Sequence, residues 1–201
     1  STQGCRDEMP SRGPQPAGAK LLSDDALMAI VSTRGDSTVF GELVGRWHHH
    51  IAGLCLRLTG NLQDAEDAVQ ETFARIFASR QQFRGDARFA TWAWRIAVNA
   101  SHDVRRKSSR VPVDSEFPLD SLSSDGNPSA RLNEQHDRTQ SVSNALATLP
   151  DELRTVVVLR HYQQLKFREI AEVLSIPMGT VCSRMTEALT RLSTLLKDLS
   201  D

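Results

Sequence analysis

The chain has 201 residues, 39% of them hydrophobic and 24% charged, and its formal net charge at pH 7 is −1. This composition is typical of a globular chain with room for one medium domain or two small ones. No stretch approaches the roughly eighteen apolar residues of a membrane span, and no apolar segment follows the N-terminus, so we expect no membrane insertion, no secretory signal and a cytoplasmic location. Three scattered cysteines, Cys5, Cys55 and Cys182, fit a reducing compartment.

The near-zero net charge conceals a strong separation of charge along the chain. Residues 61–74 hold four acids and no Lys or Arg, whereas residues 75–110 hold nine basic residues against two acids. Residues 111–137 then hold six acids against one arginine. A basic block between acidic ones indicates that one segment meets phosphate while its neighbours repel it.

Helical periodicity dominates most of the chain. Residues 1–20, rich in proline and glycine, are predicted to form a disordered tail. Ser23 is the expected N-cap of a first helix, and further helices are predicted at about 38–58, 64–80 and 89–107, which makes 21–107 the first domain.

A second helical unit follows a predicted linker. Residues 108–131 are rich in Ser, Pro, Asp and Gly, which favours an acidic flexible linker. Helical pattern returns over 132–201, the second predicted domain. Because no alternating run is long enough for a strand, the predicted fold class is all-α, with two small helical domains.

The helix over 64–80 has two different faces. Its apolar positions share one face, while Asp67, Gln70, Glu71 and Ala74 share another that is acidic and short in side chain. The alternative for this second face is a solvated helix surface.

The segment over 83–107 mixes basic and aromatic residues, which is typical of proteins that bind single-stranded nucleic acid. Phe89, Trp92 and Ile96 fall on one helical face and are expected in the core. The positions expected to be exposed are Trp94, Arg95, Asn99, His102, Arg105 and Arg106.

The segment FREIAEVLSIPMGTVCSRM, residues 167–185, places two short amphipathic helices around Pro177. This spacing predicts a helix-turn-helix, whose second helix enters the DNA major groove, with a plain helical hairpin as the alternative. The expected apolar stripe of the second helix is Val181, Met185, Leu189 and Leu192. Because the recognition face is poor in charge, we expect weak DNA binding by this unit alone.

Three blocks in order resemble the extracytoplasmic-function sigma factors of bacteria: DAEDAVQETF, FRGDARFATWAWRIAVN and LPDELRTVVVLRHYQQLKFREIAEVLSIPMGTVCSR. The resemblance covers roughly residues 21–199. It implies a sigma domain 2 and a sigma domain 4 in a promoter-specificity subunit of RNA polymerase, which is not an enzyme and needs no cofactor. It also implies that an anti-sigma factor covers the binding surfaces.

The resemblance assigns three sets of site residues. Contacts to the clamp coiled coil of the largest polymerase subunit would come from Asp67, Gln70 and Glu71. Contacts to the melted −10 element would come from Phe83, Arg84, Arg88, Trp94, Arg95, Asn99, Arg105 and Arg106. Contacts to the duplex −35 element would come from Pro177, Met178, Thr180, Cys182, Ser183, Arg184 and Arg191, in a domain that also contacts the polymerase flap.

The sequence departs from the family pattern at four positions. Cys182 stands where many members carry Lys or Arg, and Glu187 lies near a position that is often basic. Ser175 replaces a turn glycine, and Lys166 replaces a Ser or Thr before a helix. These changes suggest an unusual −35 contact set.

Other chemistries find weaker support in the sequence. Three consecutive histidines, His48 to His50, point about 100° apart on a helix and do not converge on one metal, so no metal site is expected. Nothing near Cys55 or Cys182 lowers a thiol pKa, and no catalytic motif is present. Two rivals stay open: an autonomous dimeric helix-turn-helix regulator, and a protein-interaction module without DNA binding.

Overall fold

The structure is a computed structural model that describes residues 22–108, 142 and 144–198. The predicted tail and, apart from Ser108, the predicted linker lie outside the described residues. The described part is helical throughout and contains no strand, so the predicted all-α class is confirmed. No helix among the described residues is long and apolar enough to cross a membrane.

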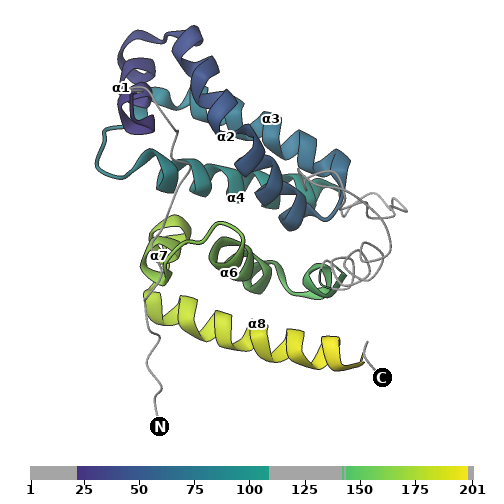
Figure 1. Cartoon of the computed structure of the whole chain (residues 1–201). Helices are drawn as coiled ribbons and strands as arrows, with labels where there is room; N and C mark the ends of the chain where they lie inside the picture. The colour runs from purple at the N-terminus through teal and green to yellow at the C-terminus, as the bar shows by residue number, and fades with distance from the viewer. Residues whose placement is uncertain (1–21, 109–141, 143, 199–201) are drawn as a thin grey trace, which may run out of the picture.

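The helices fall into two groups, which Figure 1 shows above and below one another. The first bundle consists of α1 (Asp24–Arg34), α2 (Ser37–Thr59), α3 (Leu62–Ala78), the short 3-10 helix η1 (Arg80–Gln82) and α4 (Phe89–Ser108). The second bundle consists of α6 (Asp151–His161), α7 (Phe167–Leu174) and α8 (Met178–Asp198), preceded by helical residues 144–148.

Local chemistry sets the helix ends in the first bundle. The Ser23 hydroxyl accepts a hydrogen bond from the Ala26 N–H at 3.2 Å, as expected of an N-cap. Helix α2 ends at Gly60, whose φ of 90° favours glycine. Helix α3 begins two residues earlier than predicted because the Asn61 side chain accepts from the Asp64 N–H at 2.7 Å.

Trp47 of α2 stands at the centre of the first bundle and is 2% exposed. Its ring packs edge-on against Phe89 and Trp94, each at 5.3 Å between centroids, and its Nε1 donates to Asp24 Oδ2 at 2.9 Å. Cys55 is also buried here, and burial raises the pKa of its thiol to about 11. Cys55 is therefore a small residue of the core.

The expectation that Trp94 is exposed is wrong. Its side chain is 4% exposed because position 94 of α4 faces α2, where the Trp47 ring receives it. Trp92, expected in the core, is only half-buried and packs on Phe83 at 5.5 Å between centroids. Trp94 therefore has no surface on which a base could stack.

The second bundle is built around α6, whose residues 153–159 are all buried. Helices α7 and α8 pack on it, with Ile170 and Val181 fully buried. In α8 the inward stripe contains Ala188 rather than Leu189, which is 47% exposed. The reason is the helical period, because Ala188 follows Val181 by seven residues whereas Leu189 turns outward.

The two bundles pack against each other along α4. Helix α4 lies between α2 and α3 on one side and α6 and α7 on the other, and α8 lies on the far side of the second bundle (Figure 1). The buried apolar residues of both bundles belong to one continuous cluster. Helix α4, which carries most of the predicted −10 contacts, is therefore an internal element of this arrangement.

Candidate polymerase and nucleic-acid interfaces

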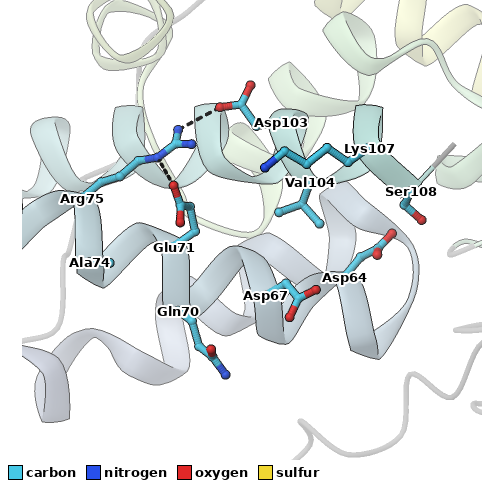
Figure 2. Close-up of a pocket in the computed structure, with 10 residues that line it drawn as sticks. All are labelled: Asp64, Asp67, Gln70, Glu71, Ala74, Arg75, Asp103, Val104, Lys107 and Ser108. Carbon is cyan, nitrogen blue, oxygen red and sulfur yellow. Dashed lines mark hydrogen bonds and ion pairs between the residues drawn. The ribbon is translucent and has the colours of Figure 1, made fainter. Parts of the chain in front are cut away.

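The predicted polymerase contacts lie together on one side of α3. Asp67, Gln70 and Glu71, here called the docking face, line a groove of about 580 Å³ between α3 and the end of α4 (Figure 2). They gather there because residues three and four apart share one side of a helix. The opposite side of α3 is anchored in the core by Ala68 and Ile76, both fully buried.

An ion-pair ladder fixes the groove. Arg75 donates from Nε to Glu71 Oε1 at 2.7 Å and from Nη1 to Asp103 Oδ2 at 2.8 Å, which ties α3 to α4. The same arginine lowers the pKa of Asp103. Glu71 is therefore partly committed within the molecule, whereas Asp67 and Gln70 are exposed to a partner.

The loop between η1 and α4 encloses a second hollow. A space of about 480 Å³ is lined by residues 83–88 on one side and by α1 on the other. Asp25 Oδ1 of α1 accepts from the Phe89 N–H at 2.6 Å and so fixes the end of the loop. Gly85 has a φ of 78°, a conformation that strains any other residue. Arg84 and Arg88 of this loop are exposed, and Phe83 is half-buried.

The surface of α4 that faces the second bundle is here called the strand face and consists of Arg95, Asn99, His102 and Arg105. Arg95 and Asn99 are exposed, whereas His102 and Arg105 are half-buried. Arg106 points elsewhere, with 75% of its side chain exposed, and pairs with Asp103. The structure thus brings three of the predicted −10 residues together with His102.

The strand face is in direct contact with the second bundle. Arg95 donates to the Glu172 carbonyl at 2.5 Å and to the Val173 carbonyl at 3.2 Å. His102 Nε2 lies 3.0 Å from Thr155 Oγ1, and Arg105 pairs with Asp151. Between them lies a hollow of about 350 Å³ that Asn99 also lines.

The helix-turn-helix forms as predicted, with a strained turn. Ser175 has a φ of 54°, the left-handed region that glycine usually occupies at such a turn. At the start of α7 the Lys166 N–H donates to Glu169 Oε2 at 2.8 Å. Lysine has no acceptor, so it cannot return the bond as a Ser or Thr cap does.

Most of the predicted duplex contacts lie on the outer face at the start of α8. Met178 is 52% exposed, Pro177 and Ser183 are exposed, and Thr180 and Cys182 are half-buried. The two predicted arginines both have acidic partners, and Arg184 lines the hollow between α4 and the second bundle rather than the outer face. Arg184 pairs with Glu152 of α6, and Arg191 donates to Glu187 Oε1 at 2.7 Å. These pairs reduce further the positive charge that α8 offers to phosphate.

Within the described residues, no group of three or more His, Cys, Asp or Glu side chains is placed to hold a metal ion. His48 and His49 are exposed, and His50 is half-buried beside Trp47 at 6.2 Å between centroids. Burial lowers the pKa of His50.

Sequence reasoning missed the acidic and polar partners of the basic residues. Asp151, Glu152 and Thr155 all meet predicted DNA-contacting residues or their neighbour His102. It also missed Arg154, which is 1% exposed and inserts between the bundles. A signal existed for Arg154, because it is the one charge in a mostly apolar run from Leu153 to Leu159 that otherwise holds only one polar residue, Thr155.

Comparisons with known proteins agree with the arrangement of the helices. The family descriptions Sigma-70 region 2 and Sigma-70, region 4 match residues 43–111 and 145–194. The solved structure of CnrH in complex with the cytosolic domain of CnrY superimposes with a TM-score of 0.65 over 87% of this chain and 97% of that chain, at 24% identity. RpoE in complex with the anti-sigma factor NepR from Bartonella quintana gives a TM-score of 0.62 over 79% and 96%, at 23% identity. These two likenesses concern the fold alone.

Curated relatives are closer in sequence. The RNA polymerase sigma-H factor of Pseudomonas aeruginosa is 33% identical over 83% of this chain and 90% of its own length. The factor SigW of Bacillus subtilis is 32% identical over 83% and 93%, and the sigma-E factor of Escherichia coli K12 is 33% identical over 85% and 92%. The chain therefore belongs to the sigma-70 family and, within it, to the extracytoplasmic-function sigma factors of bacterial RNA polymerase.

Proposed function

We propose that this chain directs core RNA polymerase to its promoters through three separate surfaces: the docking face of α3, the loop and α4 of the first bundle, and α8. The observation that carries the proposal is the grouping of Asp67, Gln70 and Glu71 along one groove of a sigma region 2 bundle. Sigma factors are initiation subunits without catalytic activity of their own, and this one works in the cytoplasm with the polymerase.

The docking face suits a basic helical partner such as the clamp coiled coil of the largest subunit. Asp67 and Gln70 are exposed, and the ladder through Arg75 holds Glu71 in place before any partner arrives. A preorganised polar surface loses little side-chain entropy on binding. Complementary charge at such a surface also speeds association.

The loop over 83–88 and the strand face of α4 suit the melted −10 strand. The hollow beside the loop is of a size to take an unstacked base, with Arg84 and Arg88 exposed beside it for phosphate. Unstacking a base costs a few kcal/mol, and its capture in a pocket offsets that cost. Trp94 plays no part in this capture, because it is buried.

Helix α8 suits the duplex −35 element, with Pro177, Met178, Thr180, Cys182 and Ser183 on its outer face. Its arginines are already paired, so its contribution to affinity is small. Tethering to polymerase raises the effective concentration of such a weak reader at its site. The second bundle, to which α8 belongs, would also contact the polymerase flap. An anti-sigma partner, of the kind that NepR is for RpoE, would compete for these surfaces.

The test is transcription by core polymerase on the DNA upstream of the chain's own gene. With the purified chain we expect discrete start sites that are absent with core polymerase alone. An autonomous repressor or a pure interaction module gives no new start site. That outcome, in the presence of measurable binding to core, would overturn the proposal.

A further inference from the structure

We propose that the second bundle is a cover for the strand face of α4, so that the chain alone competes with promoter DNA for its own −10 contacts. This inference rests on the proposed function in one respect, because the strand face is assigned to DNA there. The contact itself is a property of the chain and can be measured without polymerase.

The contact between the bundles uses the side chains that DNA would need. The Arg95 guanidinium donates hydrogen bonds to two carbonyls at the end of α7, and Arg105 forms an ion pair with Asp151. Guanidinium groups bind phosphate through the same N–H donors. Arg95 and Arg105 therefore serve either α6 and α7 or a DNA strand, and not both together.

Residues of both bundles, buried as well as exposed, form the contact. The fully buried Arg154 of α6 donates to the Leu58 carbonyl of α2 at 2.9 Å and to the Leu146 and Leu149 carbonyls of its own bundle at 2.8 Å. Leu58 lies in the last turn of α2, where carbonyls lack helical partners. A buried arginine with carbonyls on both sides thus supplies one α2 carbonyl with a donor from α6.

A third contact joins the two bundles where α2 meets the end of α6. The Arg57 guanidinium of α2 lies over the Tyr162 ring at 4.0 Å from its centroid, and Tyr162 follows α6 directly. The bundles are therefore joined at the Tyr162 edge, at Arg154 and along α4. The exposed pairs at the rim are individually modest, whereas opening also separates the buried Arg154 contact and the shared apolar cluster, so the cover opens only when polymerase or DNA supplies replacement contacts.

The chain carries its own reporter of this contact. Its one tyrosine, Tyr162, lies in the second bundle, whereas Trp47, Trp92 and Trp94 all lie in the first. Energy transfer from tyrosine to tryptophan, read from the excitation spectrum of the tryptophan emission, therefore measures closure in the full unlabelled chain.

The opening variant is Asp151→Arg, which sets like charges against Arg105. We expect transfer to fall, and affinity for a fluorescent thymidine oligonucleotide to rise roughly tenfold, the factor expected when about nine chains in ten are closed. The matched control is Glu42→Lys, which reverses an exposed charge of α2 whose partner Arg46 keeps Asp24. The control is expected to change neither quantity.

Two further variants keep the test decisive. Thr155→Val removes the hydroxyl that faces His102 at constant size and should open the chain if Asp151→Arg disturbs folding, as judged by helicity and melting temperature. The exchange Asp151→Arg with Arg105→Asp should restore energy transfer, which is its only readout.

Reduced transfer with tighter oligonucleotide binding, and restored transfer in the exchange, supports the cover. Unchanged transfer in both opening variants overturns it, and so does reduced transfer without any gain in oligonucleotide affinity. Failure of the chain to bind core polymerase would instead refute the proposed function and leave these measurements intact.

Discussion

The two helices proposed to meet DNA, α4 and α8, are held in opposite ways. Helix α4 lies between the bundles, and its strand face touches α6 and α7 through Arg95, His102 and Arg105. Helix α8 lies on the outside of the second bundle, and Met178 at its start is 52% exposed. The strand face of α4 is thus in contact with the second bundle, with only Arg95 and Asn99 exposed, while the outer face of α8 is open but carries little free positive charge. The affinity of these helices for DNA is therefore limited in two ways. On α4, contacts within the chain occupy the arginines, and on α8 little unpaired positive charge is available.

We expect core polymerase to draw the second bundle away from α4. The largest effect that we predict is the loss of polymerase binding when the docking face is altered. Asp67→Arg places a cation on the exposed part of the docking face and should weaken binding to core polymerase by about 2 kcal/mol or more, roughly thirtyfold. Affinity measured by fluorescence anisotropy with labelled chain checks this, with Glu42→Lys as the charge-matched control. Unchanged affinity for Asp67→Arg would place the polymerase contact elsewhere.

The loop before α4 offers the next largest effect. Gly85→Ala adds a methyl group that meets no atom within 4 Å, so its effect comes from the φ of 78° alone. A strain of about 1–2 kcal/mol should slow promoter melting by roughly tenfold, as measured by permanganate reactivity of the −10 region.

Gly45→Ala is the matched control for the loop. It is the same chemical change inside α2, where the added methyl group also meets nothing within 4 Å. It should raise the stability of the first bundle by about 1 kcal/mol and leave promoter melting unchanged. Equal slowing in both variants would mean that the loop conformation does not matter for melting.

The cover over α4 should weaken in acid. Burial between α4 and α6 lowers the pKa of His102, so the closed chain holds the neutral imidazole more readily than the open chain does. Asp151 of α6 and Asp103 of α4 act in the opposite sense, while Arg105 and Arg106 add to the lowering. The open form therefore binds protons first, and closure is lost as pH falls below the ordinary histidine value of 6.5.

The measurement is tyrosine-to-tryptophan energy transfer between about pH 8 and pH 5.5. We expect transfer to decrease toward acid, and His102→Gln to remove most of that decrease because glutamine does not titrate. A transfer that increases in acid, or the same slope in His102→Gln, would contradict the assignment to His102.

The turn before α8 provides the smallest effect. Ser175→Gly relieves a left-handed conformation at φ 54° and should stabilise the second bundle by about 1 kcal/mol. Thermal unfolding followed by circular dichroism checks this. A lower melting temperature would show that the serine side chain contributes more than its backbone costs.

Much of this architecture could be predicted from local chemistry. Ser23, Gly60 and the apolar periodicity set the helix ends within one or two residues, and the spacing around Pro177 predicted the helix-turn-helix. The direction in which a side chain points was harder to predict. Trp94 was expected to be exposed and is buried, whereas Leu189 was expected in the apolar stripe and is exposed. Trp94 faces inward because the Trp47 ring packs there, and Leu189 faces outward because Ala188 holds the inward position seven residues after Val181.

The contact between the bundles could not be predicted in this way. It depends on Arg154 meeting a carbonyl 96 residues away and on the pairing of Arg105 with Asp151. Neither pair leaves a periodic pattern, because each partner is a single residue in its own helix. Charge segregation predicted a basic segment that meets phosphate but gave no sign that Arg75, Arg95, Arg105 and Arg106 have partners within the chain.

The central claim is that the strand face of α4 is shared between the second bundle and the promoter. A photo-crosslinking amino acid at position 99, which lines the hollow between α4 and the second bundle, tests it most directly. In the chain alone the account predicts crosslinks to peptides of α6 and α7, and in the open promoter complex it predicts crosslinks to the non-template strand instead. Capture of the same α6 and α7 peptides in the open complex would contradict it.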